Sequence, residues 1–263
     1  MIERILFGCH NLTAGSSSRR SRRLVEAALS LGIRRFDVAP SYGLGTAEAM
    51  LGRALGARRH SVEITSKFGI LPARFGFAMS WAREPYRALR GLLPSASEGR
   101  QDVPAIGVEV SRASEFPFSA STAVRRSLSR LGTDHLDALL IHERIEGQFA
   151  RGLGEELADL KHRGLIRRWG VSGTKANVED MIGLLGSPDI VQVAAKAADA
   201  FTSAPELRLF NLRHGAEGAS AAEVAAALAM QARTLLARHS NAAVLFNTSS
   251  VVHLELFVAA LGG

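Results

Sequence analysis

Residues Gly32–Leu55 read GIRRFDVAPSYGLGTAEAMLGRAL, and this stretch says more about fold and function than any other part of the chain. A short run of β-branched and aromatic residues ends at Asp37, Tyr42 follows in a Pro-Ser-Tyr-Gly turn, and a helical pattern begins at Thr46. Apolar strands followed by amphipathic helices are the repeating unit of parallel sheets. The stretch therefore predicts an acid and a phenol at the carboxyl end of a strand, although one such unit alone is also compatible with no chemistry.

The composition indicates a globular chain. It has 263 residues, 47% of them hydrophobic, and no run of about 18 apolar residues that would suit a membrane span. The single cysteine, Cys9, excludes an intramolecular disulfide and fits a reducing compartment. No secretory signal is apparent. We therefore expect a cytoplasmic protein with no membrane partner.

The net charge of +7 raises the question of nucleic-acid binding. The arginines are scattered except for one cluster, Arg19–Arg23, at the start of a predicted helix, and neither interleaved aromatic residues nor a DNA-binding motif accompanies it. We expect a solvated helix end rather than a phosphate-binding patch, and hence no nucleic-acid partner. Salt-dependent retention on DNA, compared with a variant neutralised in the cluster, tests the alternative.

Short apolar runs alternate with helical patterns along the whole chain. The predicted strands are Arg4–Gly8, Ile33–Asp37, Val62–Lys67, Leu136–His142, Arg168–Val171, Ile190–Ala194, Leu207–Leu212 and Ala243–Phe246. The predicted helices are Ser18–Leu31, Thr46–Leu55, Ala120–Leu131, Phe149–Arg163, Asn177–Leu185, Ala219–Arg238 and Val251–Leu261. Eight strands over this length fit a (β/α)8 barrel, an α/β fold, better than an open doubly wound sheet. The first strand is not followed by Gly-x-Gly-x-x-Gly, which argues against a Rossmann dinucleotide site.

We thus predict one barrel domain over residues 1–263, with two irregularities. Residues 68–118 separate the third strand from the next helix, a distance far longer than an ordinary βα loop, and are rich in aromatic residues and prolines. We expect this inserted segment to serve in part as an active-site lid, with a partly disordered insertion as the alternative. Only Ala197–Pro205 separates the sixth and seventh strands, which predicts a reduced sixth helix.

Ionisable side chains stand at the ends of several predicted strands. Asp37 ends the second strand, Lys67 the third and His142 the fourth. Catalytic groups of barrels lie at the carboxyl ends of the strands. One lysine or histidine at such a place is usually structural, but several of them with the phenol of Tyr42 at one barrel mouth indicate a proton-transfer site.

This pattern resembles the aldo-keto reductase family. The matching segments are Phe36–Gly43 with Glu48 and Leu51-Gly52, Thr65–Lys67, Leu128–Asp134, Leu136-Asp137 leading to His142, Gly170–Gly173, Gln192 and, more loosely, Asn247–Ser250 with His253-Leu254. The resemblance covers nearly the whole chain, and its specific part is the spacing from Asp37 through Tyr42 and Glu48 to Gly52. It implies that a nicotinamide cofactor serves to reduce a small-molecule substrate that is an aldehyde or ketone, or to oxidise the corresponding alcohol.

The resemblance implies a catalytic tetrad, which consists of Asp37, Tyr42, Lys67 and His142. Tyr42 would be the general acid, and the ammonium of Lys67 would lower the phenol pKa from about 10. Asp37 would hold Lys67 through an ion pair, and His142 would orient the carbonyl by hydrogen bonding. Glu48 is expected to be packed or ion-paired rather than catalytic.

The resemblance also implies contacts to the cofactor. Ser172 and Gln192 would hold the nicotinamide carboxamide, with a structural polar group in the barrel interior as the alternative for Gln192. Thr248, Ser249 and Ser250 would offer hydroxyls and backbone N–H groups to the cofactor phosphate at a helix start; an ordinary helix cap is the alternative. We expect NADP(H) rather than NAD(H), and no metal.

Several positions depart from the family pattern on the cofactor side. Gly173 stands where many members have Asn, and no aromatic residue follows Gln192 to stack on the nicotinamide. Asn247, His253 and Phe257 stand where the phosphate-binding Lys and Arg and an adenine-binding Asn are common. These departures motivate an alternative function, a nucleotide-binding regulatory or sensor barrel of the same family.

A second alternative is a lyase or isomerase that uses Lys67 as a Schiff-base amine or as a base. The spacing between Asp37 and Tyr42 disfavours it. Trapping of a substrate on Lys67 by borohydride would support it.

Overall fold

Eight parallel strands close into one barrel in the computed structural model, which describes residues 1–14, 18–70, 119–143, 152–212 and 218–262. The strands pair in chain order, and the last strand closes against the first. They are β1 Ile5–Gly8, β2 Arg35–Asp37, β3 Glu63–Phe68, β4 Leu136–His142, β5 Ile166–Ser172, β6 Ile190–Ala194, β7 Glu206–Phe210 and β8 Ala242–Phe246. The (β/α)8 prediction and all eight predicted strands are confirmed, with shifts of at most two residues at their ends.

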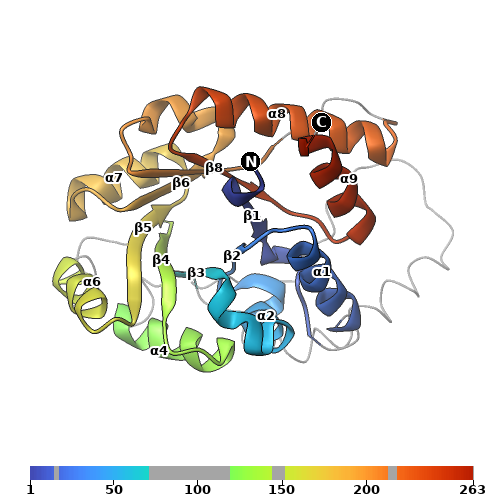
Figure 1. Ribbon diagram of the computed structural model, residues 1–263. Helices are drawn as coiled ribbons and strands as arrows, with labels where there is room; N and C mark the ends of the chain where they lie inside the picture. The colour runs from blue at the N-terminus through green and yellow to red at the C-terminus, as the bar shows by residue number, and fades with distance from the viewer. Residues whose placement is uncertain (15–17, 71–118, 144–151, 213–217, 263) are drawn as a thin grey trace, which may run out of the picture.

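Helices surround the barrel (Figure 1). They are α1 Ser18–Ser30, α2 Ala47–Leu55, α4 Ala120–Leu131, α6 Leu153–His162, α7 Lys175–Leu185, α8 Ala221–Arg238 and α9 Val251–Gly262. The helix predicted from Phe149 begins at Leu153 within the described ranges. Between β6 and β7 lies only the short 3-10 segment Ala195–Phe201, which confirms the reduced sixth helix.

Capping residues in the sequence explain where several helices begin. The side chains of Ser119 and Thr174 accept backbone N–H groups at the starts of α4 and α7. Ser220 and Glu223 form a reciprocal capping box at the start of α8. These bonds satisfy N–H groups that have no partner inside a helix, so the helix starts are encoded locally.

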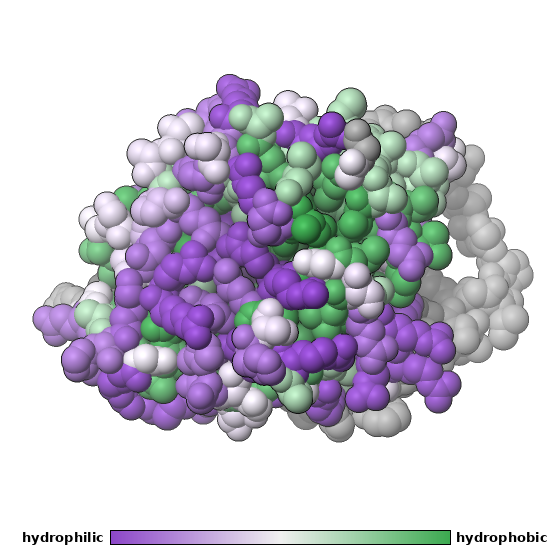
Figure 2. Space-filling model, in the orientation of Figure 1, coloured by the Kyte–Doolittle hydropathy of each residue, from purple (hydrophilic) through white to green (hydrophobic). Residues whose placement is uncertain are grey.

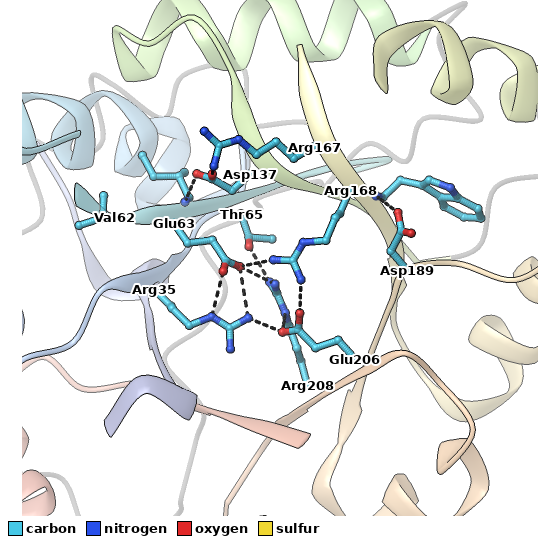
Figure 3. Close-up of polar contacts among 12 residues, drawn as sticks. Arg35, Val62, Glu63, Thr65, Asp137, Arg167, Arg168, Asp189, Glu206 and Arg208 are labelled. Atoms are coloured by element: carbon cyan, nitrogen blue, oxygen red, sulfur yellow. Dashed lines mark hydrogen bonds and ion pairs between the residues drawn. The ribbon is translucent and has the colours of Figure 1, made fainter. Parts of the chain in front are cut away.

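Side chains of alternate strand residues fill the barrel in layers, because successive residues of a strand point to opposite faces. At the amino ends of the strands, three arginines and two glutamates from four strands form a network (Figure 3): Arg35, Glu63, Arg168, Glu206 and Arg208. Arg208 is fully buried and bonds Glu63 at 2.7 Å, Glu206 at 2.8 Å and the hydroxyl of Thr65 at 2.5 Å.

Above this network lies an apolar layer. It consists of Leu6, Ala138, Leu140, Ile190, Ala243 and Leu245, all at most 6% exposed. The opposite faces of the strands pack against the helices in a separate, larger core. This apolar layer therefore separates the ionic network from the carboxyl ends of the strands, which carry the predicted site residues.

The outer surface is mostly hydrophilic in the view of Figure 2, with hydrophobic residues gathered mainly to the right of the centre. In the described part of the chain, no helix combines the length and the apolar character that a membrane crossing requires. Residues 71–118 lie outside the described ranges, so the predicted lid remains a prediction.

Candidate active site

The turn that carries Tyr42 is fixed by contacts that only this local sequence allows. The N–H of Tyr42 donates to the carbonyl of Ala39 at 3.0 Å, directly after β2. Gly43 has a φ of 56°, and a Cβ there would collide with the carbonyl of Leu12. A side chain at this position would thus meet both backbone strain and a steric clash. Glycine after the tyrosine is required to hold the phenol at the end of β2.

Lys67 and Asp37 form an ion pair inside the barrel mouth. Each side chain is 1% exposed. Burial alone would lower the pKa of Lys67, but the negative charge of Asp37 outweighs it and raises the pKa above the usual value. Lys67 is therefore held as an ammonium, as predicted. The second carboxylate oxygen of Asp37 has no hydrogen-bond partner among the described residues.

Tyr42 lies beside this ammonium. The Nζ atom of Lys67 is 4.9 Å from the centroid of the Tyr42 ring. Burial raises the pKa of Tyr42, and the positive charge of Lys67, which lowers this pKa as predicted, offsets the effect of burial only in part. The sequence could not show how deeply the phenol is enclosed, which is why desolvation was missed.

Two histidines approach the phenol ring. The rings of His142 and Tyr42 are 6.1 Å apart and nearly perpendicular, and the ring of His10, at the end of β1, lies 4.9 Å from the same phenol. Burial, together with the charge of Lys67, lowers the pKa of His142 to about 3. His142 is consequently neutral at physiological pH and carries one ring N–H donor. The structure thus brings all four members of the tetrad to one end of the barrel.

Glu48 lies behind the tetrad and is structural, as expected. Its buried carboxylate accepts the hydroxyl of Ser66 at 2.6 Å and pairs with Arg130 at 2.5 Å. Ser66 precedes Lys67 on β3, whereas Glu48 and Arg130 come from α2 and α4. Glu48 therefore ties β3 to two helices on the outside of the barrel and helps to fix the position of Lys67.

Ser172 and Gln192 lie side by side at the ends of β5 and β6, where their Cα positions pair in register. Both are at most 5% exposed. The side-chain oxygen of Gln192, Oε1, has no hydrogen-bond partner among the described residues. A buried acceptor without a partner is costly, so Gln192 is not a satisfied structural group and can accept a donor from a ligand.

An aromatic side chain that the sequence seemed to lack comes from the neighbouring strand. β6 ends without an aromatic residue, but β7 ends in Phe210, whose Cα pairs with that of Ala194. Phe210 packs with the interior residues Leu6 and Leu245 and lines a cavity of about 680 Å³ that also includes Gly173 and Ala194. Pairing across β6 and β7 was the signal that could have located it.

The residues before α9 form a helix cap. The hydroxyl of Thr248 accepts the N–H of Ser250 at 3.1 Å, and the hydroxyl of Ser250 accepts the N–H of His253 at 3.4 Å. Ser249 is exposed. Asn247, Thr248 and His253 also line a second cavity of about 420 Å³. The cap alternative is thus observed, and the same segment still borders a space that a ligand could enter.

Phe257 belongs to the core. It is fully buried and stacks on Phe246 with the ring centroids 3.9 Å apart. Although Phe257 stands where the family commonly has an adenine-binding residue, it does not line the cavity beside Thr248.

Other predicted features lie away from the mouth. Arg19, Arg20, Arg22 and Arg23 are exposed along α1, while Ser21 between them is buried and bonded to Thr13. No group of three or more His, Cys, Asp or Glu side chains in the described ranges is placed to hold a metal ion.

Comparisons with known proteins agree with this geometry. A family model described as the aldo/keto reductase family matches residues 4–217. The 6-dehydroglucose reductase of Agrobacterium fabrum is 32% identical over 176 residues, which cover 65% of this chain and 50% of that protein. The oxidoreductase YqkF of Bacillus subtilis is 28% identical over 179 residues, which cover 67% of this chain and 47% of that protein. The chain thus spans about half the length of the curated relatives it matches.

Among solved structures, an aldo-keto reductase from Klebsiella pneumoniae in complex with NADPH has the same fold. Its TM-score is 0.66 at 20% identity, and the match covers 98% of this chain and 85% of that chain.

Proposed function

The chain belongs to the aldo/keto reductase family, and on that premise we propose that it is a nicotinamide-dependent oxidoreductase that reduces an aldehyde or ketone, or oxidises the corresponding alcohol. The observation that carries this proposal is the meeting of the tetrad at one barrel end, with a buried ammonium beside a partly buried phenol. A purely binding role does not require this combination of groups.

Tyr42 is the proposed proton donor. Because burial raises the pKa of its phenol, Tyr42 carries a proton at neutral pH and can pass it to the carbonyl oxygen during reduction. The ammonium of Lys67 stabilises the phenolate that remains. In the oxidative direction, the same phenolate takes the proton of the alcohol.

His142 and Asp37 support this transfer in different ways. His142 is neutral, since its pKa lies at about 3, and its ring N–H can bond the carbonyl oxygen and orient it. Asp37 keeps Lys67 charged and in place through the buried ion pair. A nicotinamide, when bound, supplies or accepts the hydride.

The residues around the tetrad fit such a cofactor. Oε1 of Gln192, which has no partner among the described residues, suits a carboxamide N–H, and Ser172 pairs with Gln192 in register on the neighbouring strand. Phe210 adds an aromatic face to the adjoining cavity. Cavities of about 680 and 420 Å³ have the size of small-molecule sites.

We propose NADP(H) as the cofactor, with its phosphate at Thr248, Ser249 and Ser250. The NADPH complex among the similar structures supports this choice, and the start of α9 favours an anion. Lys67 is not a Schiff-base amine in this proposal, because a lysine with a raised pKa that is paired with Asp37 is not nucleophilic.

Binding and turnover have to be measured separately to test the proposal. NADPH and NADH are titrated by fluorescence, and the wild type and Tyr42→Phe are then assayed with a panel of carbonyl compounds. We expect Tyr42→Phe to bind the cofactor as the wild type does and to lose about 10²-fold or more in turnover. Unchanged turnover would refute the acid role. Cofactor binding by the wild type without any turnover would support the sensor alternative.

A further inference from the structure

Glu143, directly after His142, has an unusual backbone conformation. Its φ is 68°, in the left-handed region that residues other than glycine rarely adopt. Its N–H donates to the carbonyl of Ser172 at 2.8 Å, which joins the end of β4 to the end of β5. Strained residues of this kind cluster at functional sites. The strained backbone therefore makes Glu143 a candidate functional residue.

The carboxylate of Glu143 lies over Gly173. Asn177 Nδ2, from α7, donates to its Oε2 atom at 2.5 Å, and a Cβ on Gly173 would lie only 3.3 Å from the same atom. Glu143 thus occupies space that a side chain at position 173 would otherwise take. Gly173 follows Ser172, and its N–H donates to the carbonyl of Gln192 at 3.2 Å. The carboxylate therefore lies over the residue that follows Ser172 in the chain and whose backbone bonds that of Gln192.

Glu143 is also an acidic group in the wall of the larger cavity. Gly173, Lys175, Lys196 and Phe210 line the same cavity. Two lysines share this wall, but neither Lys175 nor Lys196 forms an ion pair with Glu143 in the described structure; Lys175 pairs with Glu179 at 3.5 Å. The negative charge of Glu143 therefore remains available to a ligand in the cavity.

We propose that the carboxylate of Glu143 lines the nicotinamide pocket. It would accept the carboxamide N–H and favour binding of the oxidised cofactor over binding of the reduced one. The inference rests on the proposed function of this site. The oxidised nicotinamide ring carries a positive charge that the reduced ring lacks, so a nearby carboxylate attracts only the oxidised form. A ligand form that is bound more tightly shifts the equilibrium toward itself. Glu143 consequently favours carbonyl reduction on the enzyme and slows release of the oxidised cofactor.

The test compares dissociation constants of the two cofactor forms. Glu143→Gln keeps the size of the side chain and an acceptor for Asn177 but removes the charge. We expect the ratio of Kd for oxidised to Kd for reduced cofactor to rise about fivefold to tenfold. Glu26→Gln, which removes an exposed carboxylate from α1, away from the cavity lining, is the control and should leave the ratio unchanged.

A second variant covers the possibility that the turn requires Glu143 for folding. Glu143→Gly removes the carboxylate and also relieves the left-handed strain, so it should unfold at a higher temperature than the wild type while showing the same rise in the ratio. A merely structural role would change both dissociation constants equally.

An unchanged ratio in both Glu143 variants, with a wild type that binds both forms, would overturn this inference and leave the proposed function standing. A wild type that binds neither form would overturn the proposed function itself.

Discussion

Removal of the ammonium from the Lys67–Asp37 pair should destabilise the barrel strongly. The perturbation is Lys67→Met, which keeps an unbranched side chain of similar length. Both partners are 1% exposed, and one oxygen of Asp37 has no partner among the described residues. The variant would therefore leave a buried carboxylate without a counter-ion. Breaking a buried pair from one side costs about 3–5 kcal/mol of the free energy of unfolding.

A double-mutant cycle separates this cost from the loss of packing. Asp37→Asn should also destabilise the protein, because it strands the ammonium of Lys67. The double variant Asp37→Asn/Lys67→Met strands no charge, so it should be less destabilised than the sum of the single variants by about 2–3 kcal/mol. Urea denaturation at neutral pH gives the free energy of unfolding of the wild type and the three variants, and equal m-values check that they share a common unfolded state. If the destabilisation of the double variant equalled the sum of the two single destabilisations within about 0.5 kcal/mol, Lys67 and Asp37 would not stabilise the fold as a pair.

The same variant tests the effect of Lys67 on the phenol. Lys67 is the main influence that lowers the pKa of Tyr42 against burial. In Lys67→Met, the pKa of Tyr42 should therefore rise further. Phenolate absorbance during an alkaline titration reports it, and subtraction of the Tyr42→Phe titration removes the contribution of Tyr86. An unchanged Tyr42 titration would show that Lys67 does not act on the phenol.

Three further substitutions probe the network and the helix packing. Arg208 and Arg35 lower the pKa of Glu206 to about 2, although burial opposes them. The ionised Glu206 carboxylate therefore stabilises the folded protein fully above pH ~4.5, and this stabilisation is lost as the pH falls through about 2. Glu206→Gln should therefore cost about 2–3 kcal/mol at pH 7, and chemical denaturation should show the difference from the wild type shrinking below pH ~4.5; a constant difference would contradict this. A Cβ at Gly52 of α2 would collide with the backbone of Leu131, so Gly52→Ala should cost about 1–3 kcal/mol. Gly183→Ala on α7 meets open space and should stabilise by up to about 1 kcal/mol, and equal thermal shifts of the two would refute the packing argument.

The alternation of strands and helices could be predicted because apolar runs and helical patterns are visible within short segments of the sequence. Apolar runs such as Leu136–His142 and helical patterns such as Ala120–Leu131 were placed at their observed bounds. The spacing after Ala194 was enough to predict a reduced sixth helix. The bounds of β5 and β7 were placed less well, and β7 contains the polar residues Glu206 and Arg208, which point into the barrel interior. Their burial depends on charges from β2, β3 and β5, which lie far away in the sequence.

The tetrad could be predicted from strand ends, whereas three properties of the mouth depend on neighbours across the barrel. Phe210 escaped notice because an aromatic residue was sought directly after Gln192, while the barrel brings the end of β7 beside the end of β6. The pKa of Tyr42 depends on its burial and on the charges of Lys67 and Asp37, which come from β3 and β2. Glu143 is locally unremarkable, and only its left-handed backbone places its carboxylate over Gly173.

The two charged layers of the barrel interior act on different properties. The positive charge of buried Arg208 is met by Glu63 and Glu206, while Lys67 is met by Asp37, and an apolar layer lies between the two sets. The groups that shift the pKa of Tyr42 are its own burial, Lys67, Asp37 and Cys9, all from the mouth. A change at Glu206 should consequently alter the free energy of unfolding without altering the titration of Tyr42. The charged layer at the amino ends of the strands and the acidity of the phenol therefore depend on separate residues, so Glu206→Gln changes stability alone, whereas Lys67→Met changes both stability and the phenol.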